Sequence, residues 1–354
     1  MRVLFLADAK SYHTQRWVDY FVDSGHQCYL LTLDRGLETK AEEFFIPSRV
    51  LPNFLKYPLS LRRVKEVTSR IRPDLINAHF IPSYGFIGAR LKFHPLAVST
   101  WGSDVLISPQ KSWLHKHRAE YILKKADLVT TDAHFTAQAI TELGVSLGKV
   151  LVSPMGIERI LLGFGEKTEK PYLTIFSNRK LEPLYDLATF LKAIPMVLAH
   201  AKADVKFVIL GDGSQKSRLI QLTKHLGLEN RVEFGGVVSR EKLLQCYRDS
   251  DIYISTSKSD STSVSLLEAM NFGLIPIVTD IPGNREWIED RINGFLFQVS
   301  DHQALAQRIV EVVNQFPLHH SVKEKNRNII REKAVWEDNM QVIETAFLRL
   351  VERA

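Results

Sequence analysis

The strongest constraint on the fold is a regular alternation of short apolar runs with amphipathic helical stretches along a chain of 354 residues. A strand followed by a helix and then another strand favours a parallel sheet with helices on both faces. The alternation stops at 158–170, where two glycines precede a charged run, and then restarts. Such a break is typical of a domain boundary, and a chain of this length suits two α/β domains of about 150–180 residues.

The alternation predicts one domain at 1–165, a second at 166–335, and a final helix over 336–354 that we expect to pack back on the first domain. The first domain has predicted strands at 2–7, 27–33, 74–79, 96–101, 127–131 and 149–153, and helices at 14–24, 60–71, 83–92, 112–125 and 134–143. The second has predicted strands at 172–177, 205–210, 231–235, 251–256, 275–279 and 294–298, and helices at 185–199, 214–226, 239–249, 264–272 and 301–315. Ligands of open parallel sheets bind beyond the carboxyl ends of the strands, so a site is to be sought there.

The composition is that of a globular protein, because 45% of the residues are hydrophobic and both domains can bury a core. Cys28 and Cys246 lie in apolar segments without C-x-x-C spacing, which argues against a disulfide framework or a zinc site. The first apolar run is interrupted by Asp8 and Lys10, so it predicts a strand rather than a signal peptide. No stretch approaches the roughly 18–20 apolar residues that span a bilayer, and we expect a cytoplasmic protein.

The net charge of +6 is concentrated in the first half of the chain, where residues 1–165 carry 21 Lys and Arg against 15 Asp and Glu. A basic half attracts anionic partners such as phospholipid head groups, a lipid phosphate or nucleic acid; the alternative is a surplus that only serves solubility. Two segments there, 54–63 and 113–118, mix large apolar groups with cations, as membrane-surface helices do. Helices that cover a core have the same composition. Peripheral contact with the cytoplasmic face of an anionic membrane is therefore one expectation.

The segment with most chemical information follows the strand predicted at 251–256, where a loop of small hydroxyl residues leads from Ser257 into a helix. The N–H groups and positive dipole end of such a helix form an anion cradle suited to a diphosphate. Asp260 lies before the helix and Glu268 inside it, and a carboxylate can accept two hydrogen bonds from a vicinal diol. Both acids can therefore hold sugar hydroxyls. The alternative for Glu268 is structural, because Ser265-x-x-Glu268 is a capping-box pattern.

This stretch, with Ile275-Pro276-Ile277-Val278-Thr279-Asp280 after it, resembles glycosyltransferase family 4, the retaining enzymes of the GT-B fold. That family carries an acidic residue, seven intervening residues and a glutamate, followed by a helix and a Gly-x-Pro-Val strand. The resemblance implies an α/β fold of the GT-B type, with two Rossmann-like doubly wound domains facing across a cleft. The first would bind the acceptor and the second the nucleotide sugar. Other similar segments are Leu210-Gly211-Asp212-Gly213, Phe234-Gly235-Gly236-Val237, Ile281-Pro282-Gly283-Asn284-Arg285-Glu286 and Asn293-Gly294-Phe295-Leu296.

The resemblance implies donor-binding roles for residues of the second half. Glu268 would hold the ribose and Asp260 would touch the transferred sugar, while Arg179, with Lys180 as the alternative, would face the leaving diphosphate. An arginine fork suits phosphate oxygens, although exposed loop charges and a tight turn would explain the same residues structurally. The other donor-binding candidates are Gly211 and Gly213 of a G-x-G turn, Gly236 and Val237 at a base-contacting strand end, and Ser261, Thr262, Ser263, Val264 and Ser265 around the helix start.

The sequence departs from the family pattern at several points. Asp260 is one methylene shorter than the usual glutamate, and Ser263 stands where glycine is common. The lysine often found near 184–186 is missing, and Trp101 replaces a histidine that contacts the donor sugar in some members. The departures at Asp260 and Ser263 bear on the identity of the sugar more than on the fold.

Polar groups after the strands of the first domain are candidates for the acceptor side. The loops after the strands predicted at 2–7, 74–79 and 96–101 should converge, because all three strands belong to one parallel sheet. Either His79 or His13 would take the place of the family histidine, or that contact is absent. Each polar group could instead be a satisfied structural residue. The acceptor- or sugar-binding candidates are Asp8, His13, Thr14, His79, Trp101 and Asp104.

The function implied by the resemblance is transfer of a hexosyl unit from a nucleotide diphosphate sugar, such as a UDP sugar, to a hydroxyl of a glycan or lipid-linked acceptor. It implies retention of anomeric configuration, no metal and no cofactor, within cell-surface glycan, lipopolysaccharide or exopolysaccharide biosynthesis, and we expect no nucleic-acid partner. A sugar-nucleotide epimerase and a non-catalytic nucleotide-sugar-binding protein remain open as alternatives. A nicotinamide dehydrogenase is disfavoured, because no G-x-G-x-x-G opens a helix after the first strand.

Overall fold

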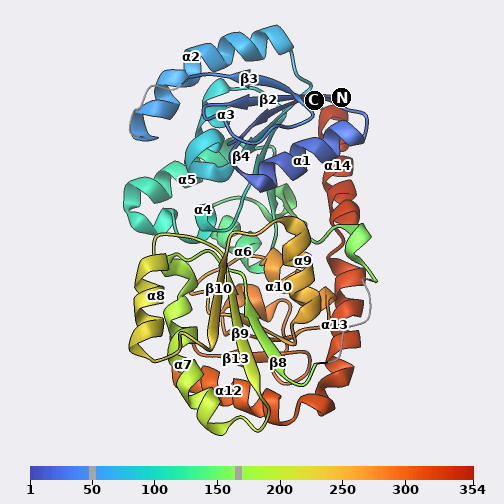
Figure 1. Cartoon of the computed structure of the whole chain (residues 1–354). Helices are drawn as coiled ribbons and strands as arrows, with labels where there is room; N and C mark the ends of the chain where they lie inside the picture. Colours follow the sequence, from blue (N-terminus) through green and yellow to red (C-terminus); the bar gives the residue numbers. More distant parts are fainter. Residues whose placement is uncertain (48–52, 164–169) are drawn as a thin grey trace. The chain divides into compact units, whose positions relative to one another are not determined.

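The computed structural model describes residues 1–47, 53–163 and 170–354, which form two compact units (Figure 1). The first unit comprises Met1–Pro154 with Glu337–Ala354, and the second comprises Met155–Trp336. The boundary lies before the predicted position 165, because Ile157 already pairs with Val335 in a β-bridge of the second unit. The charged part of the predicted break, 164–169, lies outside the described residues.

The first unit is built on a seven-stranded parallel sheet, so the doubly wound fold predicted for it is confirmed. The spatial order is β3-β2-β1-β4-β5-β6-β7: the chain first adds strands on one side of β1 and then, from β4 onward, on the other. The strands are β1 (Arg2–Leu6), β2 (Gln27–Thr32), β3 (Glu42–Phe45), β4 (Leu75–His79), β5 (Leu96–Ser99), β6 (Leu128–Thr131) and β7 (Val150–Val152). The helices are α1 (Tyr12–Asp23), α2 (Asn53–Ile71), the π-turn η1 (Phe80–Gly85), α3 (Phe86–Leu91), α4 (Ser103–Leu106), α5 (Trp113–Lys125), α6 (His134–Glu142) and, at the end of the chain, α14 (Trp336–Glu352).

Alternate residues of the central strands cover the two faces of this sheet, as the period of two along a strand requires. Leu4 and Leu6 of β1 belong to the core under α2, α3, α5 and α6, together with Ile122 of α5. Phe5 points to the other face, where its ring lies 5.5 Å from that of Phe21 on α1. Both faces are therefore covered by helices.

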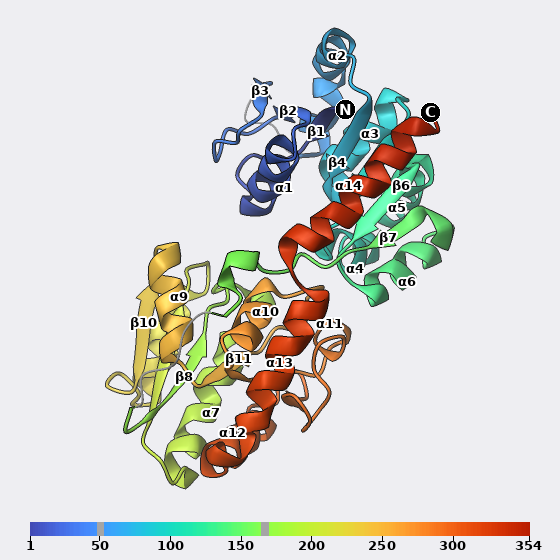
Figure 2. The same cartoon turned by 90° about the vertical axis from the view of Figure 1, so that its right-hand side faces the viewer.

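The last helix, α14, lies on the same face of the first sheet as α1 (Figure 2). Phe347 is fully buried and stacks on Phe21, with ring centroids 5.4 Å apart. Glu344 accepts a hydrogen bond from the Tyr20 hydroxyl at 2.9 Å, and its other oxygen lies 2.7 Å from Nε2 of His26. Residues from the end of the chain thus complete the core that its first residues begin.

The second unit is a six-stranded parallel sheet with the order β10-β9-β8-β11-β12-β13, which confirms the second doubly wound domain. Its strands are β8 (Leu173–Ser177), β9 (Val205–Leu210), β10 (Val232–Gly236), β11 (Ile252–Ser255), β12 (Ile275–Thr279) and β13 (Phe295–Phe297). Its helices are α7 (Leu187–His200), α8 (Lys216–His225), α9 (Arg240–Asp249), α10 (Val264–Asn271), α11 (Pro282–Arg285), α12 (His302–Asn314) and α13 (His320–Lys333).

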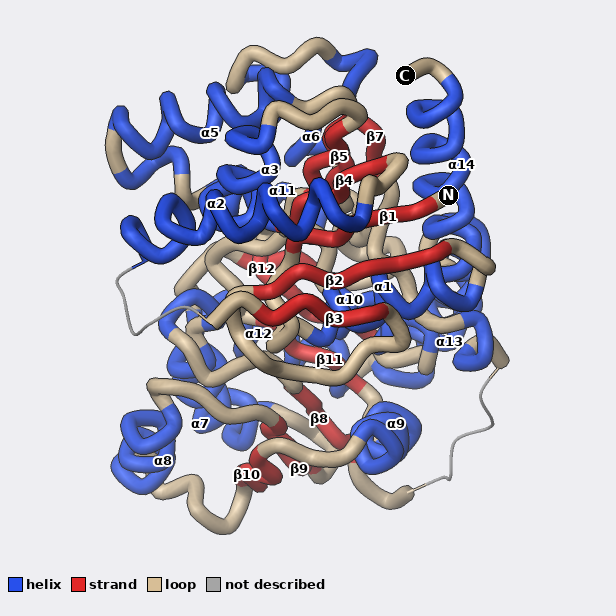
Figure 3. The backbone as a smooth tube through the Cα atoms, turned by 90° about the horizontal axis from the view of Figure 1, so that it is seen from above, coloured by secondary structure: helices blue, strands red, loops and turns tan. Residues whose placement is uncertain are grey.

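The second sheet also separates its side chains into two cores, and Figure 3 shows helices on both sides of its strands. Ile254 of β11 packs toward α7, α8 and α12, whereas its neighbour Tyr253 packs toward α9, α10 and α13. Strands that are apolar on both faces are typical of a parallel sheet between two helix layers. This arrangement fixes which helices can meet at the carboxyl ends of the strands.

The structure contains several elements that were not predicted from the sequence. β3 was missed because Glu42-Glu43-Phe44-Phe45 does not alternate, and α13 because it is largely polar and buries only a narrow stripe that includes Asn326 and Ile330. The short α4 and α11 were missed too, and α2 begins before the predicted position 60, since Pro58 lies inside the helix. Within the described ranges, no helix has both the length and the apolar character needed to cross a membrane.

Candidate functional site

The strand order of the second sheet places its topological switch point between β8 and β11. At such a point the connections leave in opposite directions, which opens a crevice beyond the carboxyl ends of the two strands. The loop after β8 carries Arg179, and the loop after β11 carries Asp260 and Ser263. The sequence candidates for binding the donor phosphates and sugar therefore come from the two loops that flank this crevice.

The structure brings Arg179 and Asp260 into direct contact. Arg179 Nη2 donates to Asp260 Oδ2 at 2.5 Å, and Nη1 donates to Ser263 Oγ at 2.6 Å. The guanidinium lies over the Tyr185 ring, 4.4 Å from its centroid, and only 9% of the Arg179 side chain is exposed. Lys180, in contrast, is exposed, so Arg179 is the cation held at the crevice.

Arg179 keeps its charge in this buried position. Burial alone would lower the pKa of the guanidinium, but the adjacent Asp260 carboxylate raises it above its usual value. Arg179 Nε is buried and has no hydrogen-bond partner among the described residues. A buried cation with an unused N–H beside a helix N-terminus is well suited to bind a phosphate oxygen.

The N-terminus of α10 is formed by the small hydroxyl residues of the loop. Ser263 is the N-cap, and its Oγ accepts the N–H of Leu266 at 3.4 Å. Ser261 and Thr262 are buried just before it, whereas Val264 and Ser265, in the first turn, are partly exposed. A capping box needs its serine at the N-cap, and the N-cap of α10 is Ser263. The capping-box alternative for Ser265 and Glu268 is therefore wrong, because Ser265 lies inside the helix.

Glu268 is buried on α10 and is held by an arginine of α9. Arg240 Nη1 donates to Glu268 Oε1 at 2.5 Å, and Arg240 Nη2 lies 3.0 Å from Glu158 Oε2. Burial raises the pKa of the Glu268 carboxyl, while the Arg240 charge and hydrogen bond lower it in part. In this structure each of the two candidate acids is thus paired with one arginine.

The G-x-G turn supports the loop that carries Arg179. Gly211 has φ +126°, and a Cβ there would lie 2.5 Å from the carbonyl oxygen of Arg179, so no other residue fits. Gly213 contacts the next part of the same loop, at Leu181. Gly236, also at positive φ, accepts the N–H of Gly211 through its carbonyl at 2.7 Å. Val237 is 79% exposed and lies at the end of β10.

Four contributors to this site were not identified from the sequence. Tyr247 of α9 donates to the Ser265 carbonyl at 3.2 Å and accepts from Asn178 at 2.8 Å, which ties α9 to α10. Lys258 lies 3.6 Å from Asp186, near the position where the family lysine is missing. The others are Arg240 and Gly283, which lies against the backbone of Asp260. The sequence signals were that Asn178, Arg240 and Lys258 each stand near the end of a strand, and that Gly283 lies in one of the segments similar to the family.

The first unit gathers its candidates at its own switch point, between β1 and β4. His13 of α1 stacks on Trp101, with ring centroids 5.4 Å apart, and His79, the last residue of β4, lies 5.3 Å from Trp101. Trp17 completes the cluster at 5.3 Å from His79. The loops after β1, β4 and β5 therefore converge, as predicted from the sheet.

The polar candidates of this cluster differ in their surroundings. His79 is 2% exposed, its Nε2 lies 2.8 Å from Asn77 Oδ1, and burial lowers the pKa of its imidazole to about 3, so the ring is neutral. Thr14 is buried in the first turn of α1, while His13 and Asp8 are partly exposed. Only part of the acceptor-side set is therefore accessible.

Asp104 is fully buried and accepts the N–H groups of Ile81 at 3.0 Å and Trp101 at 2.9 Å. Burial raises the pKa of its carboxyl to about 6, against the effect of these backbone hydrogen bonds. The side chain therefore joins the segments after β4 and β5 and holds the loop that presents Trp101.

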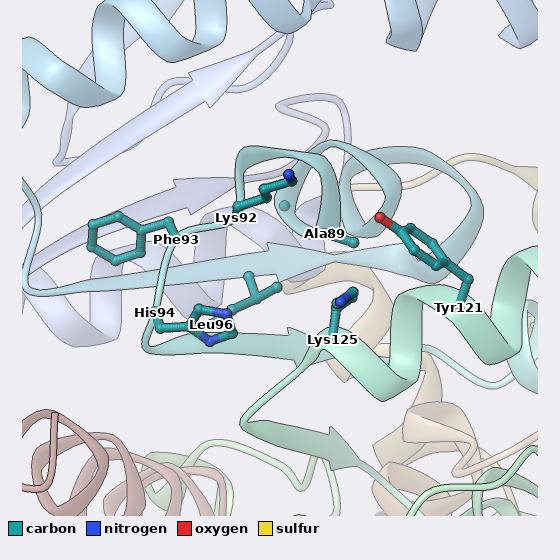
Figure 4. Close-up of a pocket in the computed structure, with 8 residues that line it drawn as sticks. Ala89, Lys92, Phe93, His94, Leu96, Tyr121 and Lys125 are labelled. Atoms are coloured by element: carbon teal, nitrogen blue, oxygen red, sulfur yellow. The ribbon is translucent and has the colours of Figure 1, made fainter.

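A hollow of about 340 Å³ lies at the opposite edge of the first sheet, where β5 begins at Leu96 (Figure 4). Lys92, Phe93, Tyr121 and Lys125 contribute to its wall, and none of the candidate residues does. Since ligands of parallel sheets bind at the carboxyl ends of the strands, we do not assign the hollow to the candidate site.

The second unit contains one Asp-x-Asp triplet, Asp249-Ser250-Asp251, where β11 begins. Asp251 accepts the N–H of Thr174 at 2.8 Å, and Asp249 lies 3.6 Å from Lys170. Both carboxylates thus have structural partners at the edge away from Arg179. In the part of the chain that the structure describes, no group of three or more His, Cys, Asp or Glu side chains is arranged to hold a metal ion.

Two protein-family models match the chain, one in each unit. The family described as "Glycosyl transferases group 1" matches residues 163–329, and the one described as "Glycosyl transferase 4-like" matches residues 2–133. The first match contains the Arg179, Asp260 and Glu268 site, and the second contains the aromatic cluster around Trp101.

Individual proteins and solved structures are similar over most of the chain. N-acetyl-alpha-D-glucosaminyl L-malate synthase of Bacillus anthracis is 25% identical, over 82% of this chain and 79% of that protein. The Campylobacter jejuni alpha-1,4-N-acetyl-D-galactosaminyltransferase that acts on a diNAcBac-PP-undecaprenol-linked acceptor is 28% identical, over 62% of this chain and 59% of that protein. Anabaena HepE in complex with UDP-glucose has a TM-score of 0.82 at 20% identity, over 99% of this chain and all of that one. This likeness confirms the GT-B fold.

Proposed function

We propose that the chain transfers a hexosyl unit from a UDP sugar to a glycan or lipid-linked hydroxyl. The premise is that it belongs to the group 1 glycosyltransferases with the GT-B fold. The observation that carries the proposal is the contact of Arg179 with Asp260 and Ser263 at the N-terminus of α10. That arrangement offers a cation and backbone N–H groups for a diphosphate and a carboxylate for the attached sugar.

The chemical need is to stabilise the negative charge that grows on the leaving diphosphate. Arg179 and the N–H groups after Ser263 would bind that charge, while Asp260 orients the sugar and Glu268 accepts hydrogen bonds from the ribose diol. The acceptor oxygen bonds to the anomeric carbon as the bond from that carbon to the diphosphate breaks. The acceptor proton passes to a diphosphate oxygen, and the anomeric configuration is retained, which NMR of the product would check.

The central test is turnover of UDP sugars by Arg179→Ala and Glu268→Ala. Each variant should lose at least about tenfold in turnover, or about 1.4 kcal/mol of barrier, because each loses a contact to the donor. A transferred product, rather than an isomerised donor, separates a transferase from an epimerase. Lys180→Ala is the matched control, since Lys180 is exposed and should be nearly neutral. Near-normal turnover in both site variants would contradict the assignment.

We propose that the reaction requires no metal ion. The charge on the diphosphate would be met by Arg179, whose buried Nε has no partner among the described side chains. Turnover should then be the same in excess EDTA as with added Mg²⁺ or Mn²⁺. A loss of activity in EDTA that either ion restores would refute this part of the proposal.

The aromatic cluster of the first unit is proposed to lie on the acceptor side. Trp101 is partly exposed, and its ring is fixed by His13 and His79. Aromatic faces suit sugar rings because a large apolar surface is presented at small entropic cost. Trp101→Ala should reduce transfer more than it reduces hydrolysis of the donor by water. Equal loss of both reactions would count against an acceptor role.

Peripheral contact with an anionic membrane is supported by exposed apolar groups among cations in the first unit. Trp113 and Leu114 at the start of α5 are 69% and 61% exposed, and Leu59 of α2 is 65% exposed. Exposed cations of the same helices include Arg62, Arg63, Lys116, Lys124 and Lys125. Apolar groups that enter the interface beside cations suit an anionic lipid surface.

Vesicle flotation tests the membrane proposal with the whole protein. Binding to phosphatidylglycerol vesicles should exceed binding to phosphatidylcholine vesicles and weaken with salt. The double variant Trp113→Ala, Leu114→Ser should lose most of it, whereas Leu147→Ser, at a residue 68% exposed elsewhere in the unit, should not. Equal binding by all three proteins, or no binding, would refute the membrane proposal and leave the transferase proposal intact.

A further inference from the structure

The Glu268 carboxylate has an unusual setting for a group that is to bind a diol. It is 4% exposed, and the cation that contacts it, Arg240, is the first residue of α9. An arginine at a helix N-terminus faces the positive end of the helix dipole, which is unfavourable. The position therefore points to a purpose other than the stability of α9.

Arg240 is held between two carboxylates. Its Nη1 donates to Glu268 at 2.5 Å, and its Nη2 donates to Glu158 at 3.0 Å. Glu158 is 26% exposed and Glu268 only 5% by side chain, so the guanidinium reaches from solvent to a buried acid. A charge-assisted bond of this kind fixes the orientation of a carboxylate as well as its charge.

We propose that Arg240 is a positioning residue for donor binding: it keeps the buried Glu268 carboxylate ionised and oriented, so that this carboxylate can accept both hydroxyls of a vicinal diol. The inference rests on the proposed function, in which Glu268 binds the ribose of the donor. An ionised carboxylate only accepts hydrogen bonds, whereas a protonated one donates one of them and cannot serve both hydroxyls as an acceptor.

The electrostatics around Glu268 support this role for Arg240. Burial raises the pKa of Glu268, and the Arg240 charge is the largest opposing influence. The Glu158 charge adds to the effect of burial and raises the pKa further. On α13, which packs against α10, Arg327 donates to the Asn271 carbonyl at the far end of α10. Among the described residues, Tyr247 of α9, Tyr253 of β11 and Glu158 also interact electrostatically with Glu268.

The test is the preference for UDP over 2′,3′-dideoxy-UDP, measured as a ratio of dissociation constants by calorimetry between pH 5.5 and 8.5. Without the Arg240 cation the pKa of Glu268 rises, so the acid stays protonated to higher pH. As the pH is lowered, the preference for the diol is therefore lost at a higher pH than in the wild type. In Arg240→Gln the midpoint of this loss should move up by at least about one pH unit, the lower end for an opposite charge in contact. Arg240→Lys should move it back toward the wild-type midpoint.

The matched control is Lys242→Gln, which removes an exposed cation from the same turn of α9 and should leave the midpoint unchanged. The same midpoint in Arg240→Gln and the wild type would overturn the inference. So would an equal loss of the preference at every pH, since Arg240 would then act on the nucleotide directly or on the fold.

If the wild-type protein bound neither nucleotide, the proposed function itself would fail. If it bound UDP with the diol preference and Arg240→Gln did not change the midpoint, only this inference would fail.

Discussion

At the scale of single residues, the fully buried Asp104 makes stability depend on pH. Its pKa is about 6 in the folded protein against 3.8 for the unperturbed group. The folded state therefore binds the proton more tightly, and the free energy of unfolding should fall as pH rises from about 4 to 6. Asp104→Asn should remove this dependence and cost about 1–3 kcal/mol, because one backbone N–H loses its acceptor. Thermal unfolding from pH 4 to 7 measures it, and parallel curves for the two proteins would contradict the prediction.

Some contacts of individual residues could be predicted from the sequence and others could not. The placement of Arg179 and Asp260 at the same end of the sheet could be predicted, because each follows an apolar strand and parallel strands present their carboxyl ends on one side. Their donor-binding roles were implied by the family resemblance and stay a prediction. The contact of Arg240 with Glu268 could not be predicted, because Glu268 lies 28 residues further on and a charge at a helix start usually faces solvent. The mutual contact of Arg179 with Asp260 depends on the order of the strands, which local patterns do not specify.

At the scale of elements, α10 depends on its N-cap, and Ser263 has two functions there. Its Oγ accepts the N–H of Leu266 and a hydrogen bond from Arg179. Ser263→Ala should cost about 1 kcal/mol of stability and also weaken UDP binding several-fold, because Arg179 loses a partner. Asp301→Ala removes the N-cap of α12 in the same unit, where Asp301 accepts the N–H of Ala304 at 2.8 Å. It should cost similar stability and leave UDP binding unchanged. Equal binding by the two variants in calorimetry would refute the second function.

Most elements could be predicted because a parallel sheet needs apolar strands and its helices need one apolar side. β8 to β13 lie within one or two residues of their predicted bounds. β3 was not predicted because it is an edge strand, paired with β2 alone among the described strands, so its residues need not alternate. α13 was not predicted because its outer surface is polar and the stripe of apolar side chains that it packs against the core is narrow.

At the scale of the whole molecule, the first unit depends on residues that follow the second in the chain. Phe347 is fully buried against Phe21, so Phe347→Ala should cost about 3–5 kcal/mol. Val342→Ala, on the same helix at 50% exposure, should cost far less. Urea unfolding of each variant, followed by tryptophan fluorescence, would measure each cost. A Phe347→Ala protein as stable as the wild type would show that α14 is dispensable.

The return of the chain to its first unit has a consequence for biosynthesis. In topological terms the second unit is an insertion within the first, and all of its residues are synthesised before Glu337–Ala354. Until then the Phe5 and Phe21 side of the nascent first sheet lacks its last cover, an apolar surface of the kind that chaperones recognise. The first unit therefore cannot be completed until α14 has followed the whole of the second unit out of the ribosome.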